Sequence, residues 1–192
     1  TELADDTYKA TATATDISGK VTMSSLVNFK IDNNAPTLAV TDPVNGAYVY
    51  GLWLINATYS DAFLKSEEYS IEGTGWMSLT TPWDTTMWKD GQHTLTVRVS
   101  DLSGKETTVG IMVNVDNTPP NLAIVYPIDK TSIRGETTIE AHADDAVALK
   151  SVNLLITNET GNVTSARLFK EEQFFKYDLD TRLLHDGTYT IT

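Results

Sequence analysis

Asp90-Gly91-Gln92-His93-Thr94-Leu95-Thr96-Val97-Arg98-Val99-Ser100-Asp101-Leu102-Ser103-Gly104-Lys105 is the stretch that decides the fold. A similar stretch stands 85 positions earlier, at residues 5–20, and a third copy begins at residues 186–192. Residues 31–40 likewise return as residues 115–124. A long repeat made of short alternating segments is typical of a string of β-modules. We therefore expect spacing, display or assembly as the role, rather than the chemistry of one enzyme domain.

The repeat divides the 192 residues into three segments. Residues 1–33 correspond to the C-terminal strands of one module, 34–118 to a complete module, and 119–192 to a module without its last strands. The third segment carries 11 additional residues between Ile156 and Leu179, which we expect to lengthen a hairpin around residues 158–162. Because the chain begins and ends inside repeats, we expect it to be a piece of something longer.

Alternating apolar residues predict which face of each strand is buried. Along residues 53–59 one face carries Trp53, Ile55, Ala57 and Tyr59, and the other carries Leu54, Asn56 and Thr58. The counterparts of the first face are Ile139, Ala141 and Ala143, which identifies it as the core side. About seven such short strands per module, each apolar on one face, predict an all-β protein of tandem β-sandwiches.

Charge and composition exclude several classes of partner. The chain has 26 acidic and 14 basic residues and a formal charge of −12, which argues against nucleic acid. No apolar run is long enough to insert into a membrane, and no signal peptide is visible. Cysteine is absent, so stability must come from packing. The charge suits a self-repelling surface, a salty medium or cation binding.

Recurring short motifs resemble the bacterial and archaeal Ig-like modules that occur in tandem on large cell-surface and secreted proteins. The motifs are Ala35-Pro36 and Pro119-Pro120, residues 42–46, Trp83-Asp84-Thr85-Thr86 with Leu179-Asp180-Thr181-Arg182, and residues 101–105. The resemblance implies immunoglobulin-like sandwiches and an extracellular or cell-surface location in a prokaryote, and the acidity suggests an archaeon. Such modules serve as stalks, adhesins, filament subunits and accessory parts of secreted enzymes.

Catalysis has little support in the sequence. The three histidines are scattered, and His93 stands where Tyr8 and Tyr189 stand in the other copies, which favours packing over chemistry. No cysteine nucleophile and no Gly-rich phosphate loop is present. Aspartates that recur in every copy favour turns and caps over an acid–base pair. We therefore expect no enzymatic activity.

Calcium is the cofactor that the module junctions suggest. Asp32-Asn33 and Asp116-Asn117 precede proline-containing junctions that are similar to the linkers of cadherins, where clustered carboxylates bind calcium and stiffen the rod. Calcium takes six to eight oxygens, so neighbouring loops must contribute. The available carboxylates are Asp61, Asp144, Asp145, Asp16 and Asp101. The alternative is that Asp-Asn caps the last strand and proline stiffens a short linker.

Surface positions suggest modification and binding. Asn56, Asn158 and Asn162 each begin a glycosylation sequon; Asn56 lies on the solvent face, and the other two in the lengthened hairpin. Trp76, near two glycines, is the tryptophan that we expect to be exposed and able to bind a ligand. Trp83 and Trp88 align with Leu179 and Leu184, so we expect both to pack in or beside the core.

These patterns favour a non-catalytic structural module of a stalk, fibre or surface assembly. Its partners would be neighbouring Ig-like modules or copies of itself, because residues 5–33 and 119–192 together contain the strands of one module. Strand complementation joins copies head to tail in this way; the other interpretation is a longer array in one chain. Two further alternatives are an adhesin that binds a protein or glycan, and an accessory domain of a secreted hydrolase.

Overall fold

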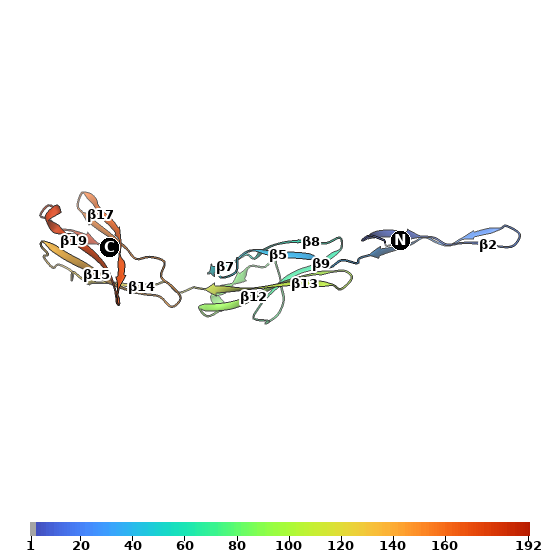
Figure 1. Cartoon of the computed structure of the whole chain (residues 1–192), viewed down its shortest axis with the longest axis horizontal. Helices are drawn as coiled ribbons and strands as arrows, with labels where there is room; N and C mark the ends of the chain where they lie inside the picture. The colour runs from blue at the N-terminus through green and yellow to red at the C-terminus, as the bar shows by residue number, and fades with distance from the viewer. Residues whose placement is uncertain (1–2) are drawn as a thin grey trace. The chain divides into compact units, whose positions relative to one another are not determined.

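The computed structural model describes residues 3–192, and nearly all of its regular structure is β-strand (Figure 1). Two short 3-10 helices, η1 (Thr85–Met87) and η2 (Thr181–Leu183), are the exceptions in this range. The prediction of an all-β fold is confirmed. Contacts divide the chain into two compact units, the first ending at Val115 and the second beginning at Asp116. The predicted boundaries after residues 33 and 118 stay predictions.

A sandwich of two layers makes up most of the first unit. One layer is a five-stranded sheet in the order β10 (Met77–Ser78), β9 (Leu64–Ile71), β12 (Gly91–Asp101), β13 (Glu106–Val115) and β6 (Tyr48–Val49). The other layer contains β5 (Thr37–Asp42) paired with β8 (Asn56–Ser60), and β7 (Leu52–Trp53) paired with β11 (Trp83–Asp84). Four of these nine strands are only two residues long.

The core lies between these layers, as the alternation predicts. Ile55 is 3% exposed, while Leu54 beside it is 49% exposed. Tyr59 departs from the pattern at 38% exposure, since it lies one residue from the end of β8. From the five-stranded sheet, the apolar residues buried in this core cluster are Val49, Tyr69, Ile71, Leu95, Val97, Val113 and Val115; Val99 of β12 is also fully buried.

Residues 6–31 of the first unit form two successive strand pairs. The pairs are β1 (Asp6–Ala10) with β4 (Val27–Ile31), and β2 (Thr13–Thr15) with β3 (Val21–Met23). Tyr8 lies opposite Phe29, and in the complete module His93 lies opposite Val113. Equivalent residues therefore pair in both copies, so the sequence repeat is also a repeat of strand register.

A side-chain bond to the main chain explains why histidine and tyrosine exchange at one repeat position. Each side chain forms a hydrogen bond with the main-chain carbonyl oxygen four residues earlier. The bonds join the Tyr8 hydroxyl to Ala4 (3.0 Å), His93 Nε2 to Lys89 (2.7 Å) and the Tyr189 hydroxyl to His185 (2.9 Å). The Nδ1 atom of His93 also lies 2.8 Å from Glu72. His93 thus performs the same structural role as the two tyrosines.

The second unit also consists of two sheets, and it contains additional residues between Ile156 and Leu179. One sheet runs β14 (Asn121–Tyr126), β15 (Glu136–Asp144), β19 (Phe174–Asp180), β18 (Phe169–Glu171), and the other runs β17 (Gly161–Arg167), β16 (Asn153–Asn158), β20 (Thr190–Ile191). Leu179 pairs with Thr137 as Trp83 pairs with Trp53. The buried apolar residues are Ile139, Ala141, Val152, Leu154, Ile156, Leu168, Phe175 and Leu179.

The additional residues of the second unit form two hairpins, whereas the sequence predicts one. The first hairpin, β16–β17, turns at residues 158–161 as expected. The chain then reverses again between β18 and β19. Leu168 and Phe175 are 3% and 8% exposed, and both belong to the core. With the chain folded back in this second hairpin, both side chains contribute to the core of the second unit.

Candidate metal centre

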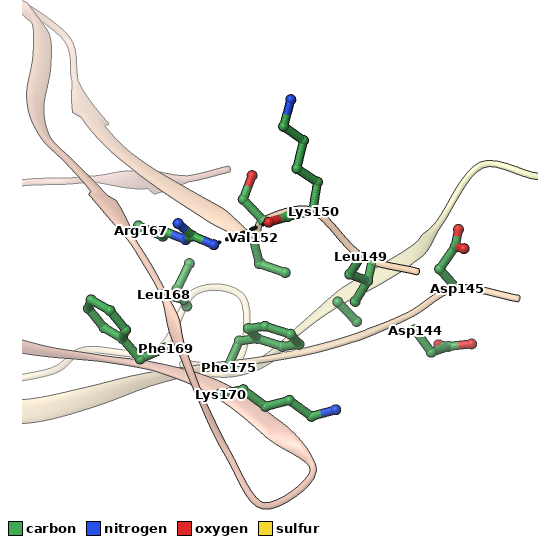
Figure 2. A pocket seen from close by; sticks show the side chains of 12 residues that line it. Asp144, Asp145, Leu149, Lys150, Val152, Arg167, Leu168, Phe169, Lys170 and Phe175 are labelled. Atoms are coloured by element: carbon green, nitrogen blue, oxygen red, sulfur yellow. Dashed lines mark hydrogen bonds between the residues drawn. The ribbon is translucent and has the colours of Figure 1, made fainter. Parts of the chain in front are cut away.

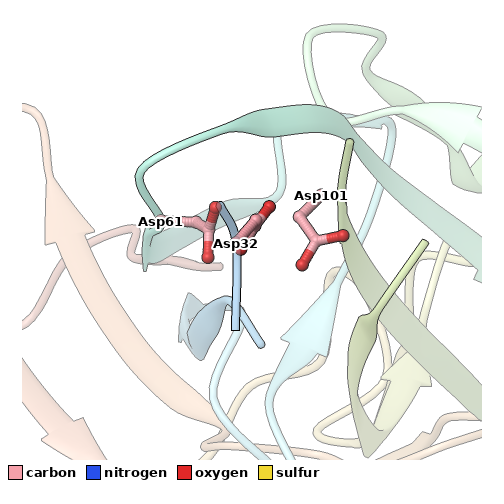
Figure 3. A group of neighbouring side chains, drawn as sticks. All are labelled: Asp32, Asp61 and Asp101. Carbon is pink, nitrogen blue, oxygen red and sulfur yellow. The ribbon is translucent and has the colours of Figure 1, made fainter. Parts of the chain in front are cut away.

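Three aspartates of the first unit bring their carboxylates together (Figure 3). Asp32 follows β4, Asp61 follows β8, and Asp101 is the last residue of β12. One oxygen from each carboxylate lies within 4.8 Å of the other two. Among the residues that the structure describes, these three acidic side chains are close enough to one another to share a metal ion.

Local turns hold two of the three carboxylates in place. Asp101 Oδ1 accepts hydrogen bonds from the Ser103 hydroxyl (2.9 Å) and the Lys105 N–H (2.8 Å). Asp61 Oδ1 accepts the N–H of Phe63 at 2.7 Å. The Leu102 N–H then donates to the Phe63 carbonyl at 2.9 Å, which joins the two turns. Each turn uses one carboxylate oxygen, so the second oxygen of each side chain remains for a ligand.

Several carboxylate oxygens of this cluster are buried without a hydrogen-bond partner. Asp101 has no exposed surface, and its Oδ2 has no hydrogen-bond partner. Both Asp32 oxygens are also buried without a partner. Lys105 donates instead to the main-chain oxygen of Asp32 (2.6 Å) and to Ser103 Oγ (2.9 Å). Buried carboxylate oxygens are costly unless paired or bound to a metal, so the arrangement fits a cation.

The protonation of the cluster supports the same conclusion. Burial raises the pKa of Asp32, and the charges of Asp101 and Asp61 raise it further, while Lys105 opposes them. Burial also raises the pKa of Asp101, but bonds from Ser103 and Lys105 and the charge of Lys105 outweigh it and leave that pKa below its usual value. Asp32 therefore resists ionisation beside an ionised Asp101, and a cation would relieve the repulsion.

The donor set matches calcium better than a transition metal. All three side chains offer oxygen, and neither histidine nor cysteine belongs to the group. Carboxylate oxygen suits hard cations such as calcium, whereas zinc prefers nitrogen and sulfur. Asp32 could use both oxygens, and Asp61 and Asp101 one each. Water would complete the six to eight positions that calcium takes.

The structure places the other suggested calcium ligands elsewhere. Asn33 donates its main-chain N–H to Asp5 (2.6 Å) and its amide to the Leu3 carbonyl (3.3 Å). Asp144 accepts from Asn121 (3.3 Å) and lies 3.7 Å from His142. Asp145 accepts the N–H groups of Val147 and Ala148, in the same kind of turn as Asp61. Asp116 and Asn117 each have an interaction of their own, and neither belongs to the cluster.

Asp101 is the member of the cluster that the sequence indicates least clearly. In the sequence it is the first residue of a turn, and Asp16 has the same role, since its Oδ1 accepts from Ser18 (2.9 Å) and Lys20 (2.9 Å). An irregularity in the pairing of β12 with β9 lies between Ser100 and Asp101. This shift sets Asp101 opposite Leu64, and the sequence pattern alone gives no sign of it.

The tryptophan and the asparagines that the sequence suggests for binding and glycosylation can now be placed in the fold. Trp76 is 41% exposed, with the Arg98 guanidinium 4.0 Å from its ring centre. Asn56 is exposed on β8, and Asn158 Oδ1 accepts the N–H (3.0 Å) and hydroxyl (2.7 Å) of Thr160. The side chain of Asn162 lies outside the described part of the structure. Ligand binding by Trp76 and glycosylation of the three asparagines stay predictions.

Two family models match the chain. The model described as "Bacterial Ig-like domain (group 3)" matches residues 1–75, and the model described as "Bacterial Ig domain" matches residues 120–192. Among the curated proteins no match is found. The matched segments contain two copies of the repeated stretch, residues 5–20 and 186–192, and the copy at residues 90–105 lies between them.

Several solved structures are similar over part or most of the chain. The endo-β-1,4-mannanase from Thermotoga petrophila matches at 19% identity over 45% of this chain and 21% of its own, with a TM-score of 0.40. Fibronectin(III)-like modules of Clostridium thermocellum CbhA match at 15% over 75% and 78%, with a TM-score of 0.42. A tetra-tandem repeat in the extending region of a large adhesion protein matches at 22% over 98% and 52%, with a TM-score of 0.38.

This chain therefore spans about a fifth of the mannanase and about half of the adhesion-protein structure. Within residues 3–192, neither of the two three-residue helices could cross a membrane.

Proposed function

We propose that this chain, which is built of bacterial Ig-like modules, is a non-catalytic structural part of an extracellular or cell-surface protein, stiffened by calcium. Modules of this kind are common on extracellular surface proteins. The observation that carries the proposal is the group of buried carboxylate oxygens without partners on Asp32 and Asp101, beside Asp61.

Calcium at this position would act on the connection between two parts of the first unit. Asp32 lies between β4 and β5, whereas Asp61 and Asp101 belong to the sandwich. The connection already bonds to the sandwich through Lys105 to the Asp32 carbonyl (2.6 Å) and Thr107 to the Pro36 carbonyl (2.5 Å). A cation would replace the repulsion among the carboxylates with attraction, and so hold residues 6–31 firmly to the module that follows.

Calcium is expected to stabilise the first unit against heat. At about 100 times its dissociation constant, a ligand of the folded state contributes about 2.7 kcal/mol, which raises Tm by roughly 10 °C for a domain of about 100 residues. All four tryptophans lie between residues 53 and 88, so tryptophan fluorescence follows the first unit alone. The measurement is a thermal melt of the whole chain in calcium and in chelator.

Asp61→Asn and Asp145→Asn form a matched pair for this experiment. Both aspartates accept main-chain N–H groups in the same kind of turn, but only Asp61 belongs to the cluster. Asp61→Asn should abolish most of the calcium-dependent rise in Tm, and Asp145→Asn should leave it intact. Equal melts with and without calcium in the unmodified chain would contradict the proposal.

Assembly between modules is a second proposal, supported by exposed apolar strand residues. Val27 and Phe29 on β4 are 56% and 41% exposed, whereas Val113, the counterpart of Phe29, is fully buried. On β14 of the second unit, Leu122 and Ile124 are 61% and 40% exposed. Strands from another module, in this chain or in a copy, would cover both rows.

If copies pair, the mass measured by light scattering should rise with protein concentration. Phe29→Ser and Ile124→Ser should each reduce this association, because each removes apolar surface from one side of the contact. Thr22→Ser, a conservative change on the exposed strand β3, is the control. A monomer at all concentrations would contradict pairing of copies, independently of the calcium experiment.

A further inference from the structure

The second unit has a hollow of about 670 Å³ on its surface (Figure 2). One wall is the connection between β15 and β16, and the other is the segment joining β17 to β18. Its volume falls within the 300–1,000 Å³ that is typical of small-ligand sites. The lining residues are Ala143, Asp144, Asp145, Leu149, Lys150, Ser151, Val152, Arg167, Leu168, Phe169, Lys170 and Phe175.

One wall of the hollow comes from the stretch in which the second unit carries its additional residues. Residues 167–170 and 175 lie between Ile156 and Leu179, where the second unit has 11 more residues than the complete module and forms the second hairpin. Leu168 and Phe175 provide a buried floor, while Phe169 is 72% exposed. An addition needed only for the core would bury its large apolar side chains. The exposed ring of Phe169 beside a hollow is instead available to a ligand.

Positive charge gathers at this place on a chain of net charge −12. Lys150, Arg167 and Lys170 line the hollow and are three of the 14 basic residues. Arg167 donates from Nη2 to the Lys150 carbonyl at 3.1 Å, which holds the guanidinium with one of its five N–H donors. The remaining donors suit a planar carboxylate, which arginine binds in a two-pronged manner.

Acidic groups lie at the other side of the same hollow. In Figure 2, Asp144 and Asp145 lie across Phe175 from Arg167. Asp145 is held by N–H groups of its own turn. Carboxylates at this side can accept hydrogen bonds from ligand hydroxyls. The hollow thus offers cations, hydroxyl acceptors and an exposed ring within one space.

We propose that this hollow binds an acidic saccharide unit, a sugar ring that carries a carboxylate. The sugar carboxylate pairs with Arg167, its hydroxyls donate to Asp144 and Asp145, and its C–H face packs against Phe169. A neutral sugar would leave the cations without a partner, and a simple anion would leave the ring and the aspartates unused. This site makes the second unit an adhesive module, a function beyond the calcium-stiffened spacer.

Titration calorimetry on the whole chain tests the site with three carboxylated probes: trigalacturonate, triglucuronate and N-acetylneuraminic acid. We expect at least one to bind, and its methyl ester, which has the same ring but no charge, to bind at least about tenfold more weakly. Binding should weaken as salt is added. Absence of binding by all three, or equal binding of acid and ester, overturns the proposal.

Two variants locate the binding. Arg167→Gln and Phe169→Ala should each weaken binding about tenfold, while Arg134→Gln makes the same charge change outside the hollow and should leave binding unchanged. Circular dichroism verifies that each variant is folded. If Arg134→Gln weakens binding as much as Arg167→Gln, or if inorganic phosphate binds as tightly as the best acidic sugar, the attraction is general electrostatics and the proposal fails.

Discussion

Replacement of Trp83 by alanine is expected to lower the free energy of unfolding of the first unit by about 3–5 kcal/mol, the usual cost of removing a buried aromatic side chain. Trp83 is 1% exposed and belongs to the core together with Ile55 and Leu79. Its ring also meets Trp88 edge to face, with centroids 6.2 Å apart. Urea unfolding followed by circular dichroism would measure the loss.

Trp76→Ala is the matched control, because it removes the same side chain from the surface. Trp76 is 41% exposed, and the Arg98 guanidinium lies 4.0 Å from its ring centre. Such a cation–π contact is worth about 0.5–1 kcal/mol at an exposed site. Similar losses for Trp76→Ala and Trp83→Ala would contradict the assignment of one ring to the core and the other to the surface.

Trp83→Leu should cost less than Trp83→Ala. Leucine stands at the equivalent position of the second unit, where Leu179 is 8% exposed and belongs to that core. Leucine would leave a smaller cavity than alanine. It would also remove the indole N–H, which is buried without a partner. The equivalence of the two positions, which is visible in the sequence, thus also predicts that Trp83→Leu loses less stability than Trp83→Ala.

The strands and their pairing could be predicted because two periodicities agree. Alternation along residues 53–59 separates Ile55 from Leu54, and the repeat assigns the face of Ile55 to the core through Ile139. Residues that occupy equivalent positions then pair in equivalent ways, as Tyr8 with Phe29 and His93 with Val113 show. A one-residue slip would reverse both faces, so the repeated pattern allows only one register.

The additional residues of the second unit could not be placed in this way, since they have no counterpart in the complete module. Leu168 and Phe169 are adjacent and both apolar, yet one is 3% and the other 72% exposed. Hydropathy gives both the same preference. Which one is buried depends on where the chain reverses between β18 and β19, and that depends on packing with Phe175. The saccharide site was missed for the same reason.

Two members of the carboxylate cluster, Asp32 and Asp61, are among the residues that the sequence suggests as calcium ligands, and calcium binding itself stays a prediction. Asp32 and Asp61 follow strands at one end of the module, so their approach agrees with the expected junction site. Asp101 enters because the ladder between β12 and β9 shifts beside it. A carboxylate that the sequence assigns to a turn can also serve a cation, since the turn uses Oδ1 and leaves Oδ2 buried without a partner.

Ile55→Ala is expected to destabilise the first unit by about 2–4 kcal/mol, the range for truncating a buried isoleucine. Ile55 is 3% exposed between the layers, and the packed strands around it cannot collapse fully into the space that alanine leaves. Leu54→Ala is the control: Leu54 precedes Ile55 directly and is 49% exposed, so its truncation should cost well under half as much. Urea unfolding followed by tryptophan fluorescence measures both variants.

Ile139→Ala should have a similarly large effect on the stability of the second unit, where Ile139 is fully buried. Circular dichroism is the probe there, because that unit has no tryptophan. If Leu54→Ala cost more than Ile55→Ala, the two faces of this segment would be reversed, and the core and the strand register would need reassignment.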